Sequence, residues 1–94
     1  MQFEWAADKA TSNLAKHGVS FDEAVTVFAS ILARTDPDPE HSEGEERFIT
    51  IGLSGRGHVL VVWHADKNGV VRIIGARLAT PRERRAYESG PGTI

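Results

Sequence analysis

The sequence predicts an α+β domain, in which two helices are followed by an antiparallel sheet and one last helix. Two observations lead to this prediction. Apolar residues recur at helical spacing in the first 30 residues, whereas residues 47–79 are rich in β-branched side chains and are divided by short turns. With 94 residues, 40% hydrophobic and 26% charged, the chain suits one folded domain over 1–94 with a frayed tail at 89–94.

The first elements are a short strand and two helices. Residues 3–5 alternate aromatic and polar side chains, as an edge strand does. A helix over 8–17 is expected to end at Gly18, because glycine suits the left-handed conformation that closes a helix. A second helix over 21–29 follows a capping box at 20–23, in which the serine would accept from the glutamate amide and the glutamate side chain would reach back.

Strands fill the middle of the chain. Residues 31–34 begin one strand, and the acidic segment 36–44 after it is expected to be irregular because it contains two prolines. Residues 47–53 alternate between two faces of a strand. Residues 58–65 form a dense β-branched run that is typical of a central strand, and residues 70–79 complete the meander.

The turn between the last two strands decides which side chains share a face. If residues 68–69 form a two-residue turn, Arg77 lies opposite Leu60 and shares one face with His58 and His64. The other face is then expected to carry Trp63, Arg72 and Ile74. A one-residue bulge would change this assignment.

The last helix is expected over 81–88. Thr80-Pro81-Arg82-Glu83 is a second capping box, with proline at the first helical position. The order of elements is therefore β-α-α-β-β-β-β-α. In such a fold the helices cover one face of the sheet and leave the other partly open to a substrate or partner.

Charge is distributed unevenly, although the net charge is only −2. Residues 1–46 hold three Lys/Arg and ten Asp/Glu, giving −7, whereas residues 47–94 hold eight Lys/Arg and three Asp/Glu, giving +5. Arginine dominates the basic half, and its planar fork matches phosphate oxygens, so a nucleic-acid surface is one interpretation. The other is a set of solvated charges that pair with the acidic half.

Several other classes of protein find little support. The absence of cysteine excludes disulfides and thiol chemistry and favours a cytoplasmic protein. The longest apolar run, residues 59–63, is far shorter than the ~20 residues that span a membrane, so no membrane contact is expected. His58 and His64 would lie about 20 Å apart along one strand. Because no histidine pair has the spacing of a helical metal site, no metal or cofactor is expected.

Arg77 is the most informative candidate for a binding site. It ends its strand just before the last helix, so its guanidinium and the amides of that helix could bind one phosphate. A salt bridge from Arg77 to Glu83 is the structural alternative. Trp5, Trp63 and Tyr87 could stack on bases, although Trp63 within its apolar run suits core packing better.

Motifs over residues 3–88 resemble those of a known family. The first set is Phe3-x-Trp5, Lys9, Asn13 and Lys16-His17-Gly18-Val19-x-Phe21-x-Glu23-Ala24. The later sets are Glu45-x-Arg47 with Ile51-Gly52, Arg72-Ile73-Ile74-x-Ala76-Arg77-x-Ala79, and Glu83-Arg84-x-x-Tyr87. In order and spacing these motifs resemble the BrnT toxins. Two positions depart from the pattern: Ala6 replaces a frequent Asp, which moves the expected helix cap to Asp8, and Gly75 replaces the usual Ser.

This resemblance implies a type II toxin–antitoxin ribonuclease with a RelE-like fold. It also implies that a BrnA-type antitoxin neutralises the toxin. The complex would contact operator DNA only through the antitoxin, and a dimer is one form that the complex could take. The weak net charge favours RNA bound to the ribosome over free RNA as the target, because few phosphate contacts would hold free RNA.

A metal-independent ribonuclease needs a base for the ribose 2′-hydroxyl, cations around the phosphate and an acid for the leaving oxygen. We assign Arg47 and Arg77 to a clamp on the scissile phosphate. His17 is the preferred proton carrier because imidazoles titrate near neutral pH, and Lys16 or Glu45 could replace it. The residues expected to position RNA are Arg72, Arg84, Arg85 and Tyr87.

Two other functions stay open. The chain could be a weak or inactive member of the fold whose open sheet face binds an antitoxin-like partner. It could also be a DNA-binding repressor, although no helix-turn-helix is recognisable and the last helix is short for reading a groove.

Overall fold

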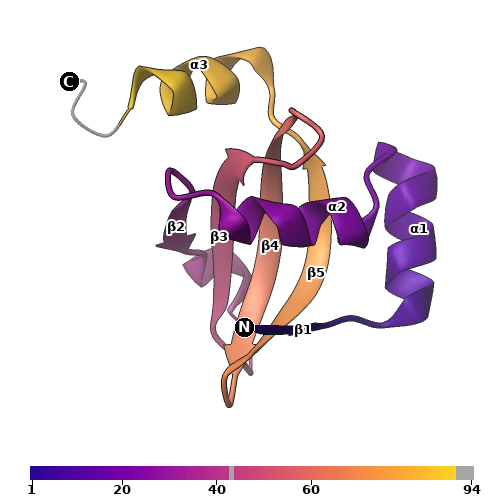
Figure 1. The fold of residues 1–94 in the computed structure, drawn as a ribbon. Helices are drawn as coiled ribbons and strands as arrows, with labels where there is room; N and C mark the ends of the chain where they lie inside the picture. The colour runs from indigo at the N-terminus through magenta and orange to yellow at the C-terminus, as the bar shows by residue number, and fades with distance from the viewer. Residues whose placement is uncertain (43, 91–94) are drawn as a thin grey trace.

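A computed structural model describes residues 1–42 and 44–90. A five-stranded sheet, with strand order β1-β5-β4-β3-β2, carries helix α2 on one face, while α1 lies beside the β5 edge and α3 lies across one end (Figure 1). The elements are β1 (Gln2–Glu4), α1 (Ala7–His17), α2 (Phe21–Thr26), β2 (Arg34–Pro37), β3 (Arg47–Leu53), β4 (Val59–Lys67), β5 (Val70–Leu78) and α3 (Pro81–Ser89), with short 3₁₀ turns η1 (Val27–Ala29) and η2 (Pro39–His41). The predicted α+β class and order of elements are confirmed.

The sheet is antiparallel except at one edge. Strands β2 to β5 form a meander of antiparallel neighbours. Strand β1 pairs in parallel with the start of β5, from Gln2 beside Val70 to Glu4 beside Arg72. The expectation of a purely antiparallel sheet therefore fails at β1, because the chain crosses to α1 instead of turning back in a hairpin.

The core lies between α2 with η1 and the central strands. Phe21, Ala24 and Val27 are at most 2% exposed, and so are Leu60 and Val62 beneath them. The contact is close enough that a Cβ on Gly52 of β3 would lie 2.9 Å from Val27 Cγ1. The helical layer is therefore packed directly onto the sheet backbone at this point.

The side chain of Asn13 hydrogen-bonds to the backbone of β5 at the sheet edge, beyond the point where β1 ends. Its Nδ2 donates to the carbonyl oxygens of Ala76 (2.8 Å) and Val19 (2.9 Å), and the Ala76 N–H donates to its Oδ1 (3.1 Å). One side-chain amide thus takes the place of a neighbouring strand and fixes α1 against the sheet.

The acidic segment after residue 34 contains more regular structure than expected. Asp36 and Pro37 belong to β2, and η2 follows them. Strand β2 is at the free edge of the sheet, and the Asp38 N–H donates to the Arg47 carbonyl at 2.8 Å. Because N–H groups alternate in direction along an antiparallel strand, position 37 faces the free edge, where proline removes no ladder bond.

Helix ends follow the predictions with one correction. Gly18 closes α1 at φ 69°, as expected. Ala6 is the N-cap of α1 and gives no side-chain hydrogen bond, and Asp8 lies inside the first turn, so the expected cap at Asp8 is wrong. The aspartate still favours the helix dipole.

A β-bulge between Trp63 and His64 changes the predicted faces. Asn68 and Gly69 form the expected turn, with φ values of 53° and 80°. The predicted register holds near this turn, but beyond the bulge Arg77 lies opposite Val61 instead of Leu60. Arg77 is consequently on the face of Trp63, away from His58 and His64, because one extra residue exchanges the faces.

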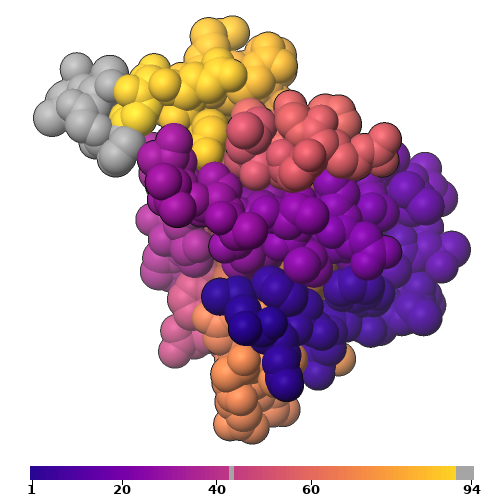
Figure 2. All heavy atoms as spheres, viewed as in Figure 1, coloured from indigo at the N-terminus to yellow at the C-terminus, as the bar shows by residue number. Residues whose placement is uncertain are grey.

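Helix α3 forms a ridge along one end of the molecule, beside the β3–β4 turn (Figure 2). It begins with the predicted capping box, ends at Ser89 and is followed by Gly90 as its C-cap. Residue 89, expected to belong to a frayed tail over 89–94, is therefore part of α3. Residues 91–94 of that expected tail lie outside the described part of the chain. None of the described helices is long and apolar enough to cross a membrane.

Candidate functional site

Three of the candidate arginines lie on the sheet face opposite α2, which we call the open face (Figure 1). Arg47 and Arg72 both pair with Ala65 of β4, from its two sides. Arg77 lies further along β5, and its guanidinium carbon is 5.2 Å from the centroid of the Trp63 ring. The open face therefore combines cationic groups with a half-buried aromatic ring.

Arg77 is held in a fixed position by Glu83 of α3. Its Nη1 and Nη2 donate to the two carboxylate oxygens at 2.7 and 3.0 Å, and Nη1 also donates to the Leu78 carbonyl at 3.1 Å. These hydrogen bonds lower the pKa of Glu83 to about 2 and raise the pKa of Arg77. The structural alternative foreseen for Arg77 is thus present, and a phosphate would reach this guanidinium in exchange for Glu83.

The two clamp arginines are not brought together. Their β4 partners, Ala65 and Val61, are four residues apart, and two strand spacings separate β3 from β5, so the Cα atoms of Arg47 and Arg77 are about 16 Å apart. Arg47 Nε is 3.7 Å from Glu45 and makes no hydrogen bond. The structure therefore does not bring the two guanidinium groups together, because each is directed to its own carboxylate.

Lys16 and His17 lie at the carboxyl end of α1, beside β5. They line a shallow hollow of about 210 Å³ with Lys9, Asn13 and Ile74. Since Ile74 is three residues before Arg77, this basic hollow borders the part of β5 that carries Arg77. We call Lys9, Lys16 and His17 the α1 patch.

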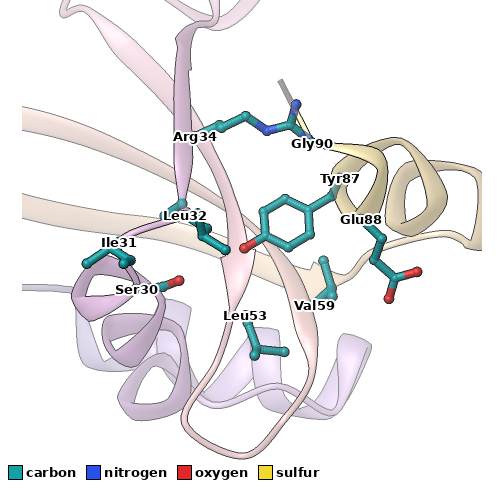
Figure 3. A pocket seen from close by; sticks show the side chains of 10 residues that line it. Ser30, Ile31, Leu32, Arg34, Leu53, Val59, Tyr87, Glu88 and Gly90 are labelled. Atoms are coloured by element: carbon teal, nitrogen blue, oxygen red, sulfur yellow. The ribbon is translucent and has the colours of Figure 1, made fainter. Parts of the chain in front are cut away.

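The predicted RNA-binding residues of α3 point in different directions. The Arg34 guanidinium lies 5.3 Å from the Tyr87 ring centroid and also reaches the Ala86 carbonyl at 3.4 Å. Figure 3 shows the Tyr87 ring directed toward Leu32, into an apolar hollow. Arg84 lines a different hollow beside the β3–β4 turn. Tyr87 therefore packs against its own chain instead of offering a free ring to RNA.

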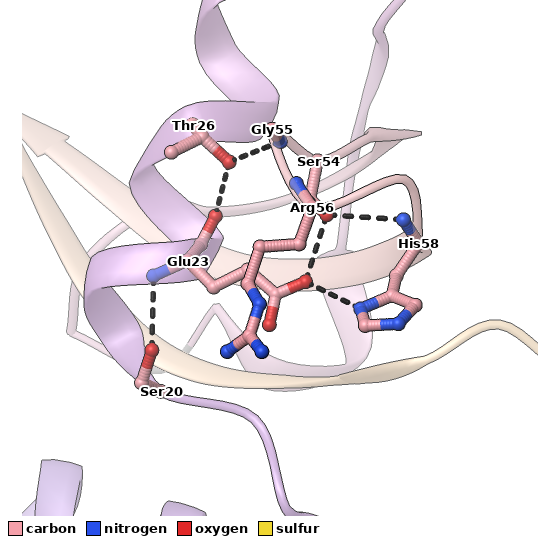
Figure 4. A network of polar contacts seen from close by, with 7 residues as sticks. All are labelled: Ser20, Glu23, Thr26, Ser54, Gly55, Arg56 and His58. Carbon is pink, nitrogen blue, oxygen red and sulfur yellow. Dashed lines mark hydrogen bonds and ion pairs between the residues drawn. The ribbon is translucent and has the colours of Figure 1, made fainter.

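A buried carboxylate holds the β3–β4 turn against α2 (Figure 4). Glu23 Oε2 lies 2.7 Å from Ser54 Oγ and 2.8 Å from His58 Nδ1. Burial raises the pKa of Glu23, but these hydrogen bonds outweigh burial and leave the pKa below its ordinary value. His58, whose side chain is 49% exposed, keeps its Nε2 free of hydrogen bonds to the described residues.

This cluster corrects the first predicted capping box. Ser20 accepts from the Glu23 amide at 3.0 Å, as expected, but the Glu23 side chain does not reach back to the helix start. Its partners are 31 and 35 residues away in sequence. No local pattern marks these partners, so the sequence does not predict this cluster.

A second histidine is buried on the helical side of the sheet. His64 is 2% exposed, and its Nε2 lies 2.7 Å from Thr50 Oγ1. Burial lowers the pKa of His64, although Asp66, 3.6 Å from Nδ1, opposes the shift. His64 is consequently neutral near pH 7 and supports the packing. Within residues 1–42 and 44–90, no group of three or more His, Asp or Glu side chains could hold a metal ion.

Comparison with known proteins adds information about family and fold. Residues 5–83 match the model of a family described as "Ribonuclease toxin, BrnT, of type II toxin-antitoxin system". The crystal structure of the Brucella abortus ribonuclease toxin BrnT is similar, with a TM-score of 0.68 and 22% sequence identity over 85% of this chain and 97% of that chain. At that identity the likeness shows a shared fold. No curated protein sequence matches the chain.

Proposed function

Because this chain belongs to the BrnT family of ribonuclease toxins of type II toxin–antitoxin systems, we propose that it cleaves RNA at the open face, around Arg77, without a metal ion. The reaction class needs no external nucleophile, since the ribose 2′-hydroxyl attacks the adjacent phosphorus. The bond from phosphorus to the 5′-oxygen breaks, which leaves a cyclic phosphate and a 5′-hydroxyl. A cation is needed for the phosphorane, together with groups that accept and return one proton.

The placement of Arg77 is the observation that carries this proposal. Its guanidinium lies on the open face, oriented by Trp63 on one side and by the two Glu83 oxygens on the other. Carboxylate and phosphate both match the planar guanidinium fork, so Glu83 occupies the place that a phosphodiester would take. Trp63 offers a ring on which a base next to that phosphate could stack.

The remaining candidates are assigned roles by the elements on which they lie. We propose His17 of the α1 patch as the proton carrier, with Lys16 as its alternative, because both lie beside β5. Arg47, with Glu45 beside it, and Arg72 would contact another phosphate of the same strand, at the far end of the open face. Arg84 and Arg85 would contact RNA from α3.

The cellular setting follows from the family. A type II toxin acts with an antitoxin, and we propose that this antitoxin is of the BrnA type and that the toxin acts in the cytoplasm on RNA presented by the ribosome. Few phosphates would be bound directly, so we expect a shallow dependence of RNA affinity on salt.

Substitution of Arg77 tests the site. Removing a cation that stabilises a transition state typically costs 10²–10³-fold in rate, so Arg77→Ala should cleave RNA about 10²–10³-fold more slowly and should no longer inhibit growth. Arg82→Ala, at an exposed position of α3, is the matched control and should cleave normally. Both variants are checked for folding by thermal denaturation.

Three further results would count against the proposal. If Arg77→Ala cleaves RNA as fast as the wild type, Arg77 is not part of the catalytic site. Loss of cleavage in EDTA would contradict metal independence. Products with a 5′-phosphate instead of a cyclic phosphate would exclude attack by the 2′-hydroxyl.

A second candidate function is a binding module without catalysis. The pairing of Arg77 with Glu83 and of Arg47 with Glu45 favours it, because both carboxylates neutralise the cations of the open face. A wild-type chain that binds its antitoxin tightly but does not cleave RNA after its release would establish this function.

A further inference from the structure

Large apolar side chains gather where the loop before β2 meets α3. Ile31 is 97% exposed, Leu32 68% and Leu53 47%. Together with Val59 and Tyr87 they line a hollow of about 520 Å³ between α3 and the adjoining ends of β3 and β4 (Figure 3). We call this hollow, defined by these five residues, the α3 groove.

The apolar surface continues past the groove. A second hollow of about 250 Å³ shares Leu53, Val59 and Glu88 with it and adds Leu78, which is 51% exposed. Large aliphatic side chains that gather in one exposed patch are typical of surfaces that bind another protein. The surface is also preformed, because its strand residues belong to the central sheet.

We propose that the α3 groove is the docking site of the antitoxin, which inserts an apolar segment flanked by acidic residues beside α3. This inference rests on the proposed function, since an antitoxin is the partner that a type II toxin requires. Leucine, isoleucine or aromatic side chains of that segment would pack on Ile31, Leu32 and Leu53.

The charges around the groove favour an acidic partner. Helix α3 carries Arg82, Arg84 and Arg85 against Glu83 and Glu88, and Glu83 is already neutralised by Arg77. A segment with Asp or Glu beside its apolar residues would therefore complement the rim of the groove. In a symmetric pair of copies, the two α3 helices would bring like charges together, which disfavours a second copy of this chain as the occupant.

RNA is a poor occupant of the same groove. Among the described residues that line it, the only arginine is Arg34, which is engaged by the Tyr87 ring and the Ala86 carbonyl. Phosphate groups would meet aliphatic side chains there instead of hydrogen-bond donors. The groove adjoins the open face, because Leu53 and Val59 lie on the same side of the sheet as Trp63. Its lining does not include Arg77 or Glu83, so substitutions in the loop before β2 can separate antitoxin binding from RNA cleavage.

The test substitutes Ile31→Glu and Leu32→Glu separately. The probe is the product of the reading frame beside this gene that restores growth, and its affinity for each variant is measured by calorimetry. A residue at the centre of an interface typically contributes enough that its loss weakens binding at least about 30-fold. Leu14→Glu is the matched control, because Leu14 is a 52% exposed leucine on α1, outside the groove. It should bind within about threefold of the wild type.

Cleavage of RNA is measured with the same variants in the absence of the antitoxin. Weakened binding by Ile31→Glu and Leu32→Glu with wild-type cleavage supports the docking site. Wild-type affinity in both variants overturns it, even if RNA cleavage establishes the proposed function. The proposal is also overturned if sedimentation shows that the wild type is a dimer and that Ile31→Glu is a monomer, because a second copy of the chain would then fill the groove.

Discussion

Asn13 offers the sharpest test of how the fold is held together. Its side chain makes three hydrogen bonds, all to buried backbone groups of Ala76 and Val19. Substitution by alanine removes all three bonds without adding bulk. The two carbonyl oxygens and one N–H group would then lose their partner at a place that is 9% exposed in the native protein.

The expected loss of stability can be worked out from these bonds. Each hydrogen bond contributes about 1 kcal/mol net, and a buried group left without a partner costs about 1–3 kcal/mol. Asn13→Ala should therefore lower the free energy of unfolding by about 3 kcal/mol, a large part of the roughly 5–15 kcal/mol of a typical domain. Asn13→Asp should cost more than alanine at pH 7, because a carboxylate would face two carbonyl oxygens.

Urea denaturation followed by tryptophan fluorescence measures this loss, and hydrogen exchange of the Ala76 amide reports on the edge of β5. Ser12→Ala, at an exposed neighbouring position of α1, is the control and should change the free energy of unfolding by less than about 0.5 kcal/mol. A loss below about 1 kcal/mol in Asn13→Ala, with unchanged protection of the Ala76 amide, would refute the role of Asn13 as a substitute strand.

Three further predictions concern single positions. Gly52→Ala should destabilise the protein by about 1–3 kcal/mol, because the new Cβ would lie 2.9 Å from Val27 Cγ1. The measurement is a lower midpoint of thermal unfolding. Gly55→Ala is the control and should be tolerated, because its new Cβ would lie no closer than 3.5 Å to the Thr26 side chain. Gly75→Ser should fold normally in the same assay, because only Asn13 Oδ1 comes within 3.7 Å of the new Cβ. The lowered pKa of His64 means that the unfolded chain binds a proton more readily than the folded one. Stability should then be complete above the unfolded pKa of 6.5 and fall as the pH drops below it, and His64→Gln should flatten this dependence in denaturation curves from pH 7.5 to 5.

Features carried by local pattern were predictable from the sequence. The capping box at the start of α3 forms as expected, because Thr80 and Glu83 satisfy each other's backbone amides. The left-handed Gly18 and the turn at 68–69 likewise depend only on local backbone geometry. The predicted alternation of faces along residues 47–53 is also observed, because Phe48 and Thr50 both contact His64 on the helical side of the sheet.

Features decided by partners distant in sequence were not predictable. Glu23 has the same capping pattern as Glu83, but Ser54 and His58 compete for its carboxylate and draw it away from the helix start. The bulge at Trp63 and His64 leaves no signature in composition, and it moved Arg77 to the other face. The separation of Arg47 from Arg77 follows from strand register, which one sequence does not determine beyond a hairpin turn.

The attachment of α3 links the two proposed surfaces. No residue of α3 is buried, so its position depends on the bonds from Arg77 to Glu83 and on the contact of Arg34 with Tyr87. A phosphate that takes Arg77 from Glu83 removes one of these attachments, whereas an antitoxin in the α3 groove contacts the helix in its docked position. Because coupling between two ligands is reciprocal, the antitoxin should weaken RNA binding without covering Arg77. Glu83→Gln removes the carboxylate partner of Arg77 both with and without bound RNA. This variant should still bind the antitoxin, but adding the antitoxin should lower its RNA affinity less than it lowers that of the wild type. An equal loss of RNA affinity in Glu83→Gln and wild type, measured by fluorescence anisotropy, would show that the antitoxin inhibits by covering the RNA site directly.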